Sequence, residues 1–284
     1  MRSERVAARG LIAEGAAILR AAGLAEARRE AVCLWAEVTG ESPADLMVGA
    51  ASVVDPDCAA AYEAAIGRRA AGEPFAHVTG WAGFRHLTLR SDRRALIPRP
   101  ETEGLVELVL ARVPGGRVVD IGTGSGCIAL SLATEGVYDQ VVGIDVSAEA
   151  LRLAEENRLL TGARVELVRS DLCAPLRSGS VDALVSNPPY LTESEYAALD
   201  ASVRDWEPTL ALASGADGLQ AIGRLLDVGR SVVRPGGWLA LEIDCARARL
   251  CATRAGASGW ADVAIHADLF GRERFLLARR SDAT

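Results

Sequence analysis

The run Asn187-Pro188-Pro189-Tyr190 has residue types that could hold an –NH₂ group in place. The two prolines stiffen the backbone and remove N–H donors, so the run offers mainly acceptors. The amide oxygen of Asn187 and the carbonyl oxygen of Pro188 can accept the two hydrogens of one –NH₂ group, and Tyr190 offers a flat face for stacking. This pattern indicates chemistry at a planar amide or amine nitrogen, with a purely structural turn as the alternative.

A second stretch, Asp120-Ile-Gly122-Thr-Gly124-Ser-Gly126, has the spacing of a nucleoside-binding loop. It follows an apolar strand and precedes a helix, where glycines let the backbone turn tightly and approach a ligand. Asp145 ends the next strand about 20 residues later, as expected for a carboxylate that accepts ribose hydroxyls. Taken alone, the glycines could equally form nothing more than a tight turn.

Two details of this loop bear on which cofactor it holds. The dinucleotide fingerprint is G-x-G-x-x-G, whereas this loop reads G-x-G-x-G and has Cys127 where the last glycine would fall. Asp120 places a carboxylate beside the loop, which would repel a pyrophosphate and attract the ammonium of a methionyl group. The loop therefore favours S-adenosylmethionine over NAD.

Both motifs need a scaffold that brings strand ends together, and the chain from about residue 115 onward has such a pattern. Helical segments separate most of the strands, which predicts a parallel, doubly wound sheet, and the last two strands lack a helix between them and should be antiparallel. We expect a Rossmann-like α/β sheet whose carboxyl edge carries both motifs. The predicted strands span 117–121, 140–145, 164–168, 181–185, 238–243, 262–266 and 274–278, and the helices span 127–133, 148–160, 219–233 and about 245–256.

Residues 1–75 have helical periodicity and contain no catalytic constellation. Ser42-Pro43 and Asp55-Pro56 each combine an N-cap residue with a first-turn proline and predict helix starts. Residues 75–79 and 84–89 are predicted to form two strands around a turn. The prolines at 98 and 100 predict a rigid extended segment that leads into a helix over 101–112.

The composition is typical of a globular chain without a membrane span. Half of the residues (50%) are hydrophobic and 24% are charged, and no apolar run reaches ~18 residues. A net charge of −7 weighs against bulk binding to duplex nucleic acid, which requires basic surface. The six cysteines show no C-x-x-C spacing and the three histidines are far apart, so we expect no metal site. The charged N-terminal stretch is a poor secretory signal, so we expect a cytoplasmic location.

Over essentially its whole length the chain resembles the HemK/PrmC family, the bacterial and organellar enzymes that methylate glutamine in peptide chain release factors. Asn-Pro-Pro-Tyr is shared with adenine N6-methyltransferases, whereas the Arg99-Pro-Glu-Thr-Glu103 run is much more specific. Related enzymes that methylate a ribosomal protein glutamine usually lack that run. The motifs that carry the resemblance are Glu73-Pro74 with Gly80, 96–103, 120–126, 186–190, 206–208, 216–219 and 268–272.

This resemblance implies a helical substrate-recognition domain over 1–75, a β-hairpin linker over 76–97 and a class I methyltransferase domain over 98–284. S-adenosyl-L-methionine would donate a methyl group to the side-chain amide nitrogen (N5) of a glutamine in a class I release factor. Positioning would drive the transfer, since no strong base can be identified. The implied cofactor-binding residues are Gly122, Thr123, Gly124, Ser125, Gly126, Asp145, Asp171, Leu172 and Asn187. The implied substrate-binding residues are Asn187, Pro188, Pro189 and Tyr190, of which Asn187, Pro188 and Tyr190 are assigned to catalysis.

The chain departs from the family pattern at two places. Asp244-Cys245 stand where the family commonly has a glycine and then a glutamine, and Leu172 stands where an aromatic residue is frequent. Residues 98–103 could close over the cofactor or peptide, or could form a rigid connector between domains. The alternative functions are an adenine N6-methyltransferase of nucleic acid, a glutamine methyltransferase of a ribosomal protein, and a non-catalytic nucleotide-binding module.

Overall fold

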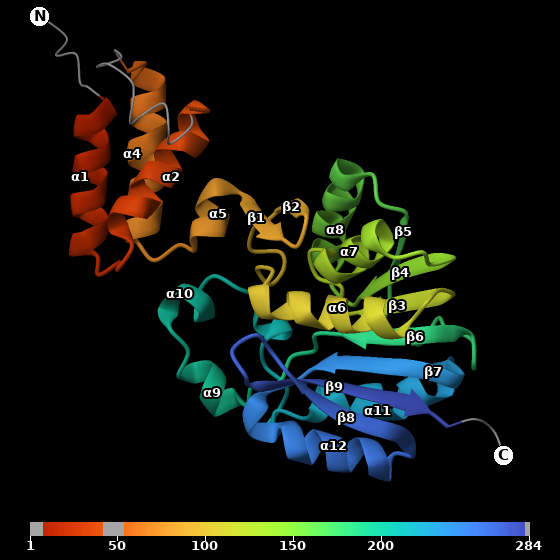
Figure 1. Cartoon of the computed structure of the whole chain (residues 1–284). Coiled ribbons are helices and arrows are strands. Elements are labelled where there is room, and N and C mark those ends of the chain that lie inside the picture. The colour runs from red at the N-terminus through yellow and green to blue at the C-terminus, as the bar shows by residue number, and fades with distance from the viewer. Residues whose placement is uncertain (1–7, 42–53, 282–284) are drawn as a thin grey trace, which may run out of the picture. The chain divides into compact units, whose positions relative to one another are not determined.

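The computed structural model describes residues 8–41 and 54–281 (Figure 1). The described residues form two compact units. The first comprises the N-terminal residues up to Gly80 together with Ala201–Trp206, and the second comprises Trp81–Asp200 and the chain from Glu207 onward.

The first unit is helical, as predicted, and packs around a small aromatic and aliphatic core. Trp35 and Tyr62 are buried and meet edge to face, with their ring centroids 5.2 Å apart. Asp55 caps the helix that starts at Pro56, because its side chain accepts the backbone N–H of Asp57. The predicted helix start at residues 42–43 lies outside the described residues. The helices are α1 (Ala8–Ala21), α2 (Ala27–Thr39), α4 (Pro56–Ala70), α5 (Phe75–Thr79) and α10 (Ala201–Arg204).

The strand predicted over 75–79 is wrong, because these residues form the short helix α5. Pro74 precedes the helix, and its carbonyl oxygen accepts two backbone N–H groups of the first turn at 2.9 and 3.0 Å. Gly80 ends the helix with a left-handed φ of 80°, which glycine adopts readily. The hairpin is therefore shorter than predicted and pairs β1 (Trp81–Phe84) with β2 (Leu87–Arg90).

The second unit contains the predicted α/β sheet. The strand order is β5-β4-β3-β6-β7-β9-β8. The strands from β5 to β7 run parallel, and β9 runs antiparallel to both of its neighbours, so the expectation of a mostly parallel sheet with an antiparallel ending is confirmed. The strands are β3 (Arg117–Ile121), β4 (Gln140–Asp145), β5 (Val165–Arg169), β6 (Val181–Ser186), β7 (Val233–Glu242), β8 (Trp260–Ala267) and β9 (Glu273–Arg280).

Helices cover both faces of this sheet (Figure 1). Neighbouring residues of β3 point to opposite faces, so Val118 packs in the cluster that includes α6 and α7, whereas Val119 packs in the cluster that includes α11 and α12. None of the helices within residues 8–41 and 54–281 is long and apolar enough to cross a membrane. The helices are α6 (Glu103–Arg112), α7 (Cys127–Glu135), α8 (Ala148–Thr161), α9 (Glu193–Ala197), α11 (Gln220–Val232) and α12 (Ala248–Ala257), with 3-10 turns η1 (Pro100–Thr102), η2 (Thr209–Ala211) and η3 (Cys245–Arg247).

Candidate functional site

The glycine loop joins the end of β3 to the start of α7 and depends on its glycines. Gly122, Gly124 and Gly126 have φ values of 71°, 57° and 86°, a region that other L-residues rarely adopt. The backbone N–H groups of Gly122 and Thr123 both donate to the carbonyl oxygen of Ile144, at 2.8 and 3.0 Å. The loop is thereby fixed to the end of β4, at the carboxyl edge of the sheet.

Asp145, the last residue of β4, bonds to the same loop. Its Oδ2 accepts the backbone N–H of Gly124 at 2.9 Å, and its Oδ1 accepts that of Ser147 at 2.9 Å. A carboxylate has about four acceptor positions, so these two bonds leave capacity for further donors. Asp145 therefore shapes the loop and can also accept hydroxyl groups from a ligand in the adjoining pocket.

Asp120 lies beneath the loop and does not line the pocket. Its side chain is fully buried, and Oδ2 accepts the hydroxyl of Thr123 at 2.7 Å. Burial raises the pKa of Asp120 to about 7, although the bond from Thr123 opposes that shift. The sequence predicts that this carboxylate faces a methionyl ammonium, whereas in the structure it bonds to the loop residue Thr123.

A single pocket brings most of the predicted site residues together. It is bounded by the ends of β3, β4 and β6, by the segment that precedes η1, and by η2. Gly126 and Tyr190 do not line it. Gly126 packs closely against α7 and α8, and Tyr190 packs against the core cluster, where burial raises its pKa to about 12. The predicted residues that line the pocket are Gly122, Thr123, Gly124, Ser125, Asp145, Asp171, Leu172, Asn187, Pro188 and Pro189.

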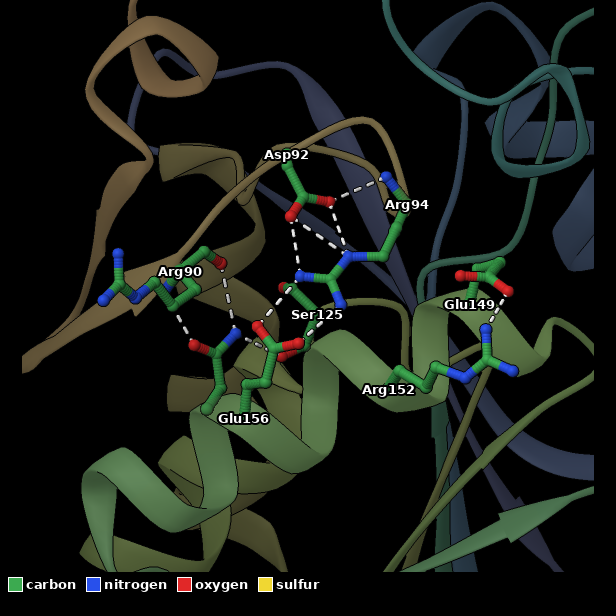
Figure 2. A network of polar contacts seen from close by, with 8 residues as sticks. Arg90, Asp92, Arg94, Ser125, Glu149, Arg152 and Glu156 are labelled. Atoms are coloured by element: carbon green, nitrogen blue, oxygen red, sulfur yellow. Dashed lines mark hydrogen bonds and ion pairs between the residues drawn. The ribbon is translucent and has the colours of Figure 1, made fainter.

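A polar network joins α8 to residues 90–94 beside the pocket (Figure 2). None of its contacts was predicted from the sequence. Arg94, which lines the pocket, bonds to Asp92 and forms a two-fold ion pair with Glu156 at 2.6 and 2.9 Å. The buried Asn157 accepts the backbone N–H of Arg90 and donates to the carbonyl oxygen of Ser125. Its side chain thereby ties the hairpin to the glycine loop.

A signal for Asn157 was present in the sequence. The buried face of α8 carries Ala150, Leu153, Ala154 and Asn157, which is the spacing of an apolar helix face. A polar residue on such a face must have partners, because an unpaired buried amide is costly. The identity of those partners could not be read from the helix alone.

We call the run Asn187–Tyr190 the clamp, and Asn187 also lines the pocket. Its Nδ2 donates to the Thr102 hydroxyl at 3.1 Å, and that hydroxyl donates to Oε2 of Glu242 at 2.7 Å. Thr102 and Glu242 are both buried. Burial raises the pKa of Glu242 to about 7, while the bond from Thr102 and the nearby charge of Arg274 lower it. The sequence analysis assigned no role to Glu242.

Comparisons with known proteins match both units of this chain. A family model for the PrmC N-terminal domain matches residues 10–80, and one for the methyltransferase small domain matches residues 101–211. A release factor glutamine methyltransferase of Cereibacter sphaeroides is 42% identical over 92% of this chain and 94% of its own. One from Deinococcus radiodurans is 40% identical over 96% of this chain and 98% of its own. The chain belongs to the family of release factor glutamine methyltransferases. The predicted family is thus confirmed.

The fold of this family member is shared with more distant methyltransferases. The crystal structure of a methyltransferase from Pyrococcus furiosus aligns with a TM-score of 0.53 at 20% identity. The alignment covers 68% of this chain and 88% of that one, and it supports the class I methyltransferase fold alone.

The family run Arg99-Pro-Glu-Thr-Glu103 borders the pocket and is held at both ends. Glu207 accepts the backbone N–H of Ile97 at 3.0 Å and pairs with Arg99 at 2.6 Å. At the other end, Thr102 bonds to Glu242 and Asn187. The segment thus forms a fixed wall of the pocket.

The structure shows the local contacts of the residues at the two departures from the family pattern. Asp244 caps η3, because its Oδ1 accepts the backbone N–H of Ala246, and it also pairs with Arg247. Leu172 lines the pocket with an unusual positive φ of 51°. Its neighbour Asp171 pairs with Arg224 at 2.7 Å.

Proposed function

We propose that this chain transfers the methyl group of S-adenosyl-L-methionine to the side-chain amide nitrogen (N5) of a glutamine in a class I peptide chain release factor. The observation that carries the proposal is one pocket that is lined both by the glycine loop with Asp145 and by Asn187-Pro188-Pro189. A nucleoside-binding loop and acceptors for an –NH₂ group therefore share one cavity. The similar proteins of Cereibacter sphaeroides and Deinococcus radiodurans are release factor glutamine methyltransferases, which supports the same reaction here.

The residues of the loop fit this cofactor. A side chain on Gly122 would project into open space, so the backbone there is open to a ligand. The buried Ser125 hydroxyl lines the pocket without a nitrogen or oxygen partner among the described residues, and the Asp145 carboxylate has spare acceptor positions. We assign Asp145 to the ribose hydroxyls, the loop from Gly122 to Ser125 to the methionyl and ribose region, and Asp171 with Leu172 to the adenine.

When bound, S-adenosyl-L-methionine supplies an electrophilic methyl group on a positively charged sulfonium. The task of the chain is to hold the target nitrogen, whose lone pair is delocalised into the glutamine carbonyl. Asn187 and Pro188 would accept its two hydrogens and direct the lone pair toward the methyl group. Such orientation and fixed dipoles can contribute several kcal/mol to rate acceleration. The methylated nitrogen is acidic, so its proton can leave to water without a dedicated base.

Tyr190 has a supporting role in this proposal. It belongs to the clamp run, but it packs against the core cluster of the second unit and lies outside the pocket lining. We assign its ring to anchoring the turn after Pro189 against that core.

The assay that tests the proposed function offers the chain three substrates with a labelled methyl donor. These are a purified class I release factor, a glutamine-bearing ribosomal protein and an adenine-containing oligonucleotide. We expect label on the release factor, with mass spectrometry locating one methyl group on a glutamine side chain. Label on the oligonucleotide, on the ribosomal protein alone, or on another residue type would overturn the assignment.

We also propose that the helical N-terminal domain recognises the release factor and that the reaction takes place in the cytoplasm, where release factors act. The support is the match of residues 10–80 to a domain model specific to this family. A fragment that starts at residue 76 should bind S-adenosyl-L-methionine by calorimetry yet methylate the intact factor poorly. Equal activity of the fragment and the whole chain on the intact factor would exclude this role.

A further inference from the structure

Three residues from distant segments meet at the clamp. Asn187 follows β6, Thr102 ends η1 and Glu242 ends β7, and the Thr102 hydroxyl bonds to both of the others. Glu242 sits level with the clamp, because Ser186 pairs with Leu241 in the register of β6 and β7. Ser186 is itself held by donating its hydroxyl to the carbonyl oxygen of Ile121 at 2.7 Å. The contact is thus built on the fixed ends of strands.

The number of protons in this contact decides which way the Asn187 amide points. The Thr102 hydroxyl has a single hydrogen, and an ionised Glu242 can only accept it. The hydroxyl oxygen is then left with lone pairs, which can accept a hydrogen only from the –NH₂ end of Asn187. The opposite amide orientation would place Oδ1 against an oxygen that has no hydrogen left to donate.

This orientation matters because the substrate presents an –NH₂ group. With Nδ2 bonded to Thr102, the Oδ1 end of Asn187 is the one available to accept from a substrate nitrogen in the pocket that Asn187 lines. A reversed amide would set two –NH₂ groups against each other and lose the acceptor. The asparagine side chain carries no preference for either orientation by itself.

Burial and the charged side chains around Glu242 act in opposite directions on the ionisation of its carboxyl group. Arg274 lies 3.9 Å from its Oε1 and is held in turn by Asp268 at 2.8 Å. Arg99 adds a further favourable charge and Glu101 an unfavourable one. Burial raises the pKa of Glu242 to about 7, so the carboxylate is mainly ionised at pH values above that.

We propose that Thr102 and Glu242 are positioning residues that hold the Asn187 amide with its oxygen directed at the target nitrogen. The inference rests on the proposed function, since it assumes a substrate –NH₂ group. It also gives Thr102 of the 99–103 run a chemical reason, because the hydroxyl at this position must both donate and accept.

The test measures single-turnover methyl transfer to a release factor at pH 8 with saturating S-adenosyl-L-methionine. Thr102→Val keeps the shape but removes the hydroxyl, and we expect a rate roughly 10–100-fold lower, as for a misplaced transition-state group. Cofactor affinity by calorimetry should stay at the wild-type value. Thr102→Ser restores the hydroxyl and should recover most of the rate. Thr134→Val, the same change at an exposed position near the end of α7, serves as the matched control.

A double-mutant cycle separates positioning from general damage. In an Asn187→Ala background there is no amide left to orient, so Thr102→Val should cause no further loss. The inference is overturned if Thr102→Val keeps the wild-type rate, if its loss repeats in the Asn187→Ala background, or if its loss follows weakened cofactor binding. Should Thr102→Val fold poorly by circular dichroism, Thr102→Ala removes the same hydroxyl and carries the same expectations.

Failure of the inference and failure of the proposed function give different results. Wild-type transfer to the release factor tests the function alone, whereas the ratios of variant to wild-type rates test the positioning role.

Discussion

The glycine loop and the Asn187 clamp lie at the same edge of the sheet, but local backbone geometry shapes the first and distant side chains orient the second. In the loop, three left-handed glycines and backbone bonds to Ile144 set the shape within a few residues of β3 and β4. In the clamp, the amide of Asn187 takes its orientation from Thr102, 85 positions away in the chain. Substitutions on the two sides should therefore separate cofactor affinity from transfer rate.

The largest expected effect is on the clamp side. Asn187→Ala removes an acceptor for the target –NH₂ group, and we expect the transfer rate at saturating cofactor to fall about 100-fold or more. Cofactor affinity should change far less, because the glycine loop and Asp145 remain. Single-turnover kinetics with a release factor measure the rate, and calorimetry measures the affinity. Near-normal turnover in this variant would show that orientation by Asn187 does not drive the reaction.

The next largest effect is expected in the glycine loop, where a substitution should weaken cofactor affinity and leave the transfer rate nearly unchanged. Asp145→Ala removes a charged acceptor for ribose hydroxyls and the bond to the Gly124 N–H. Hydrogen bonds to charged groups contribute about 1.5–3 kcal/mol, so the cofactor dissociation constant should rise roughly 10–100-fold. The transfer rate at saturating cofactor should change little. Asp139→Ala, an exposed residue just before β4, is the control, and equal affinity of both variants would contradict the role of Asp145.

A smaller effect is expected where α8 supports the loop. Asn157→Ala removes the bonds to Arg90 and Ser125 and leaves the buried Ser125 carbonyl unpaired, which costs about 1–3 kcal/mol. We expect a lower Tm together with weaker cofactor binding, but a normal transfer rate once cofactor saturates. Thermal unfolding with and without S-adenosyl-L-methionine measures both quantities. A variant with lowered Tm and unchanged cofactor affinity would limit Asn157 to a purely structural role.

The smallest effect is a pH dependence of stability on the clamp side. Burial raises the pKa of Glu242 to about 7 in the folded chain, from 4.5 when exposed. The folded state therefore binds the carboxyl proton of Glu242 more tightly than the unfolded state does. The stability that this tighter binding gives the folded chain is lost as the pH rises from about 4.5 through about 7. The glutamine side chain in Glu242→Gln does not titrate, so the Tm of this variant minus that of wild type should increase between pH 5 and pH 8. For a chain of this size, a change of about 1 kcal/mol in the free energy of unfolding shifts Tm by roughly 2–4 °C.

The buried Asp120 has a similarly raised pKa, but it is present in both the wild type and the Glu242→Gln variant. Its contribution therefore cancels when their Tm values are subtracted. A Tm difference between Glu242→Gln and wild type that stays constant over this range would contradict the assignment.

The sequence alone determined the framework of the site. The strands around the glycine loop and the antiparallel ending follow from apolar periodicity and from the missing helix between the last two strands, which can be read from the local sequence. Because parallel strands end at one edge, the loop, Asp145 and Asn187 could be assigned to a common pocket from their places after strands. The error at 75–79 has a local origin as well, since a run of five residues between Pro74 and Gly80 can form either a strand or one helical turn.

Only the tertiary structure decided which distant residues bond to the pocket-lining segments and which way the side chains there face. Asp120 could be placed beside the loop from the sequence, but whether it faces the ligand or the core depends on packing from α7 and Thr123. The contacts of Thr102 with Glu242, of Glu207 with Ile97 and of Asn157 with Arg90 join residues 140, 110 and 67 positions apart. Such pairs cannot be recognised from the local sequence, because each partner is compatible with its own segment whether or not the other is present. Only the folded sheet brings the two partners within bonding distance.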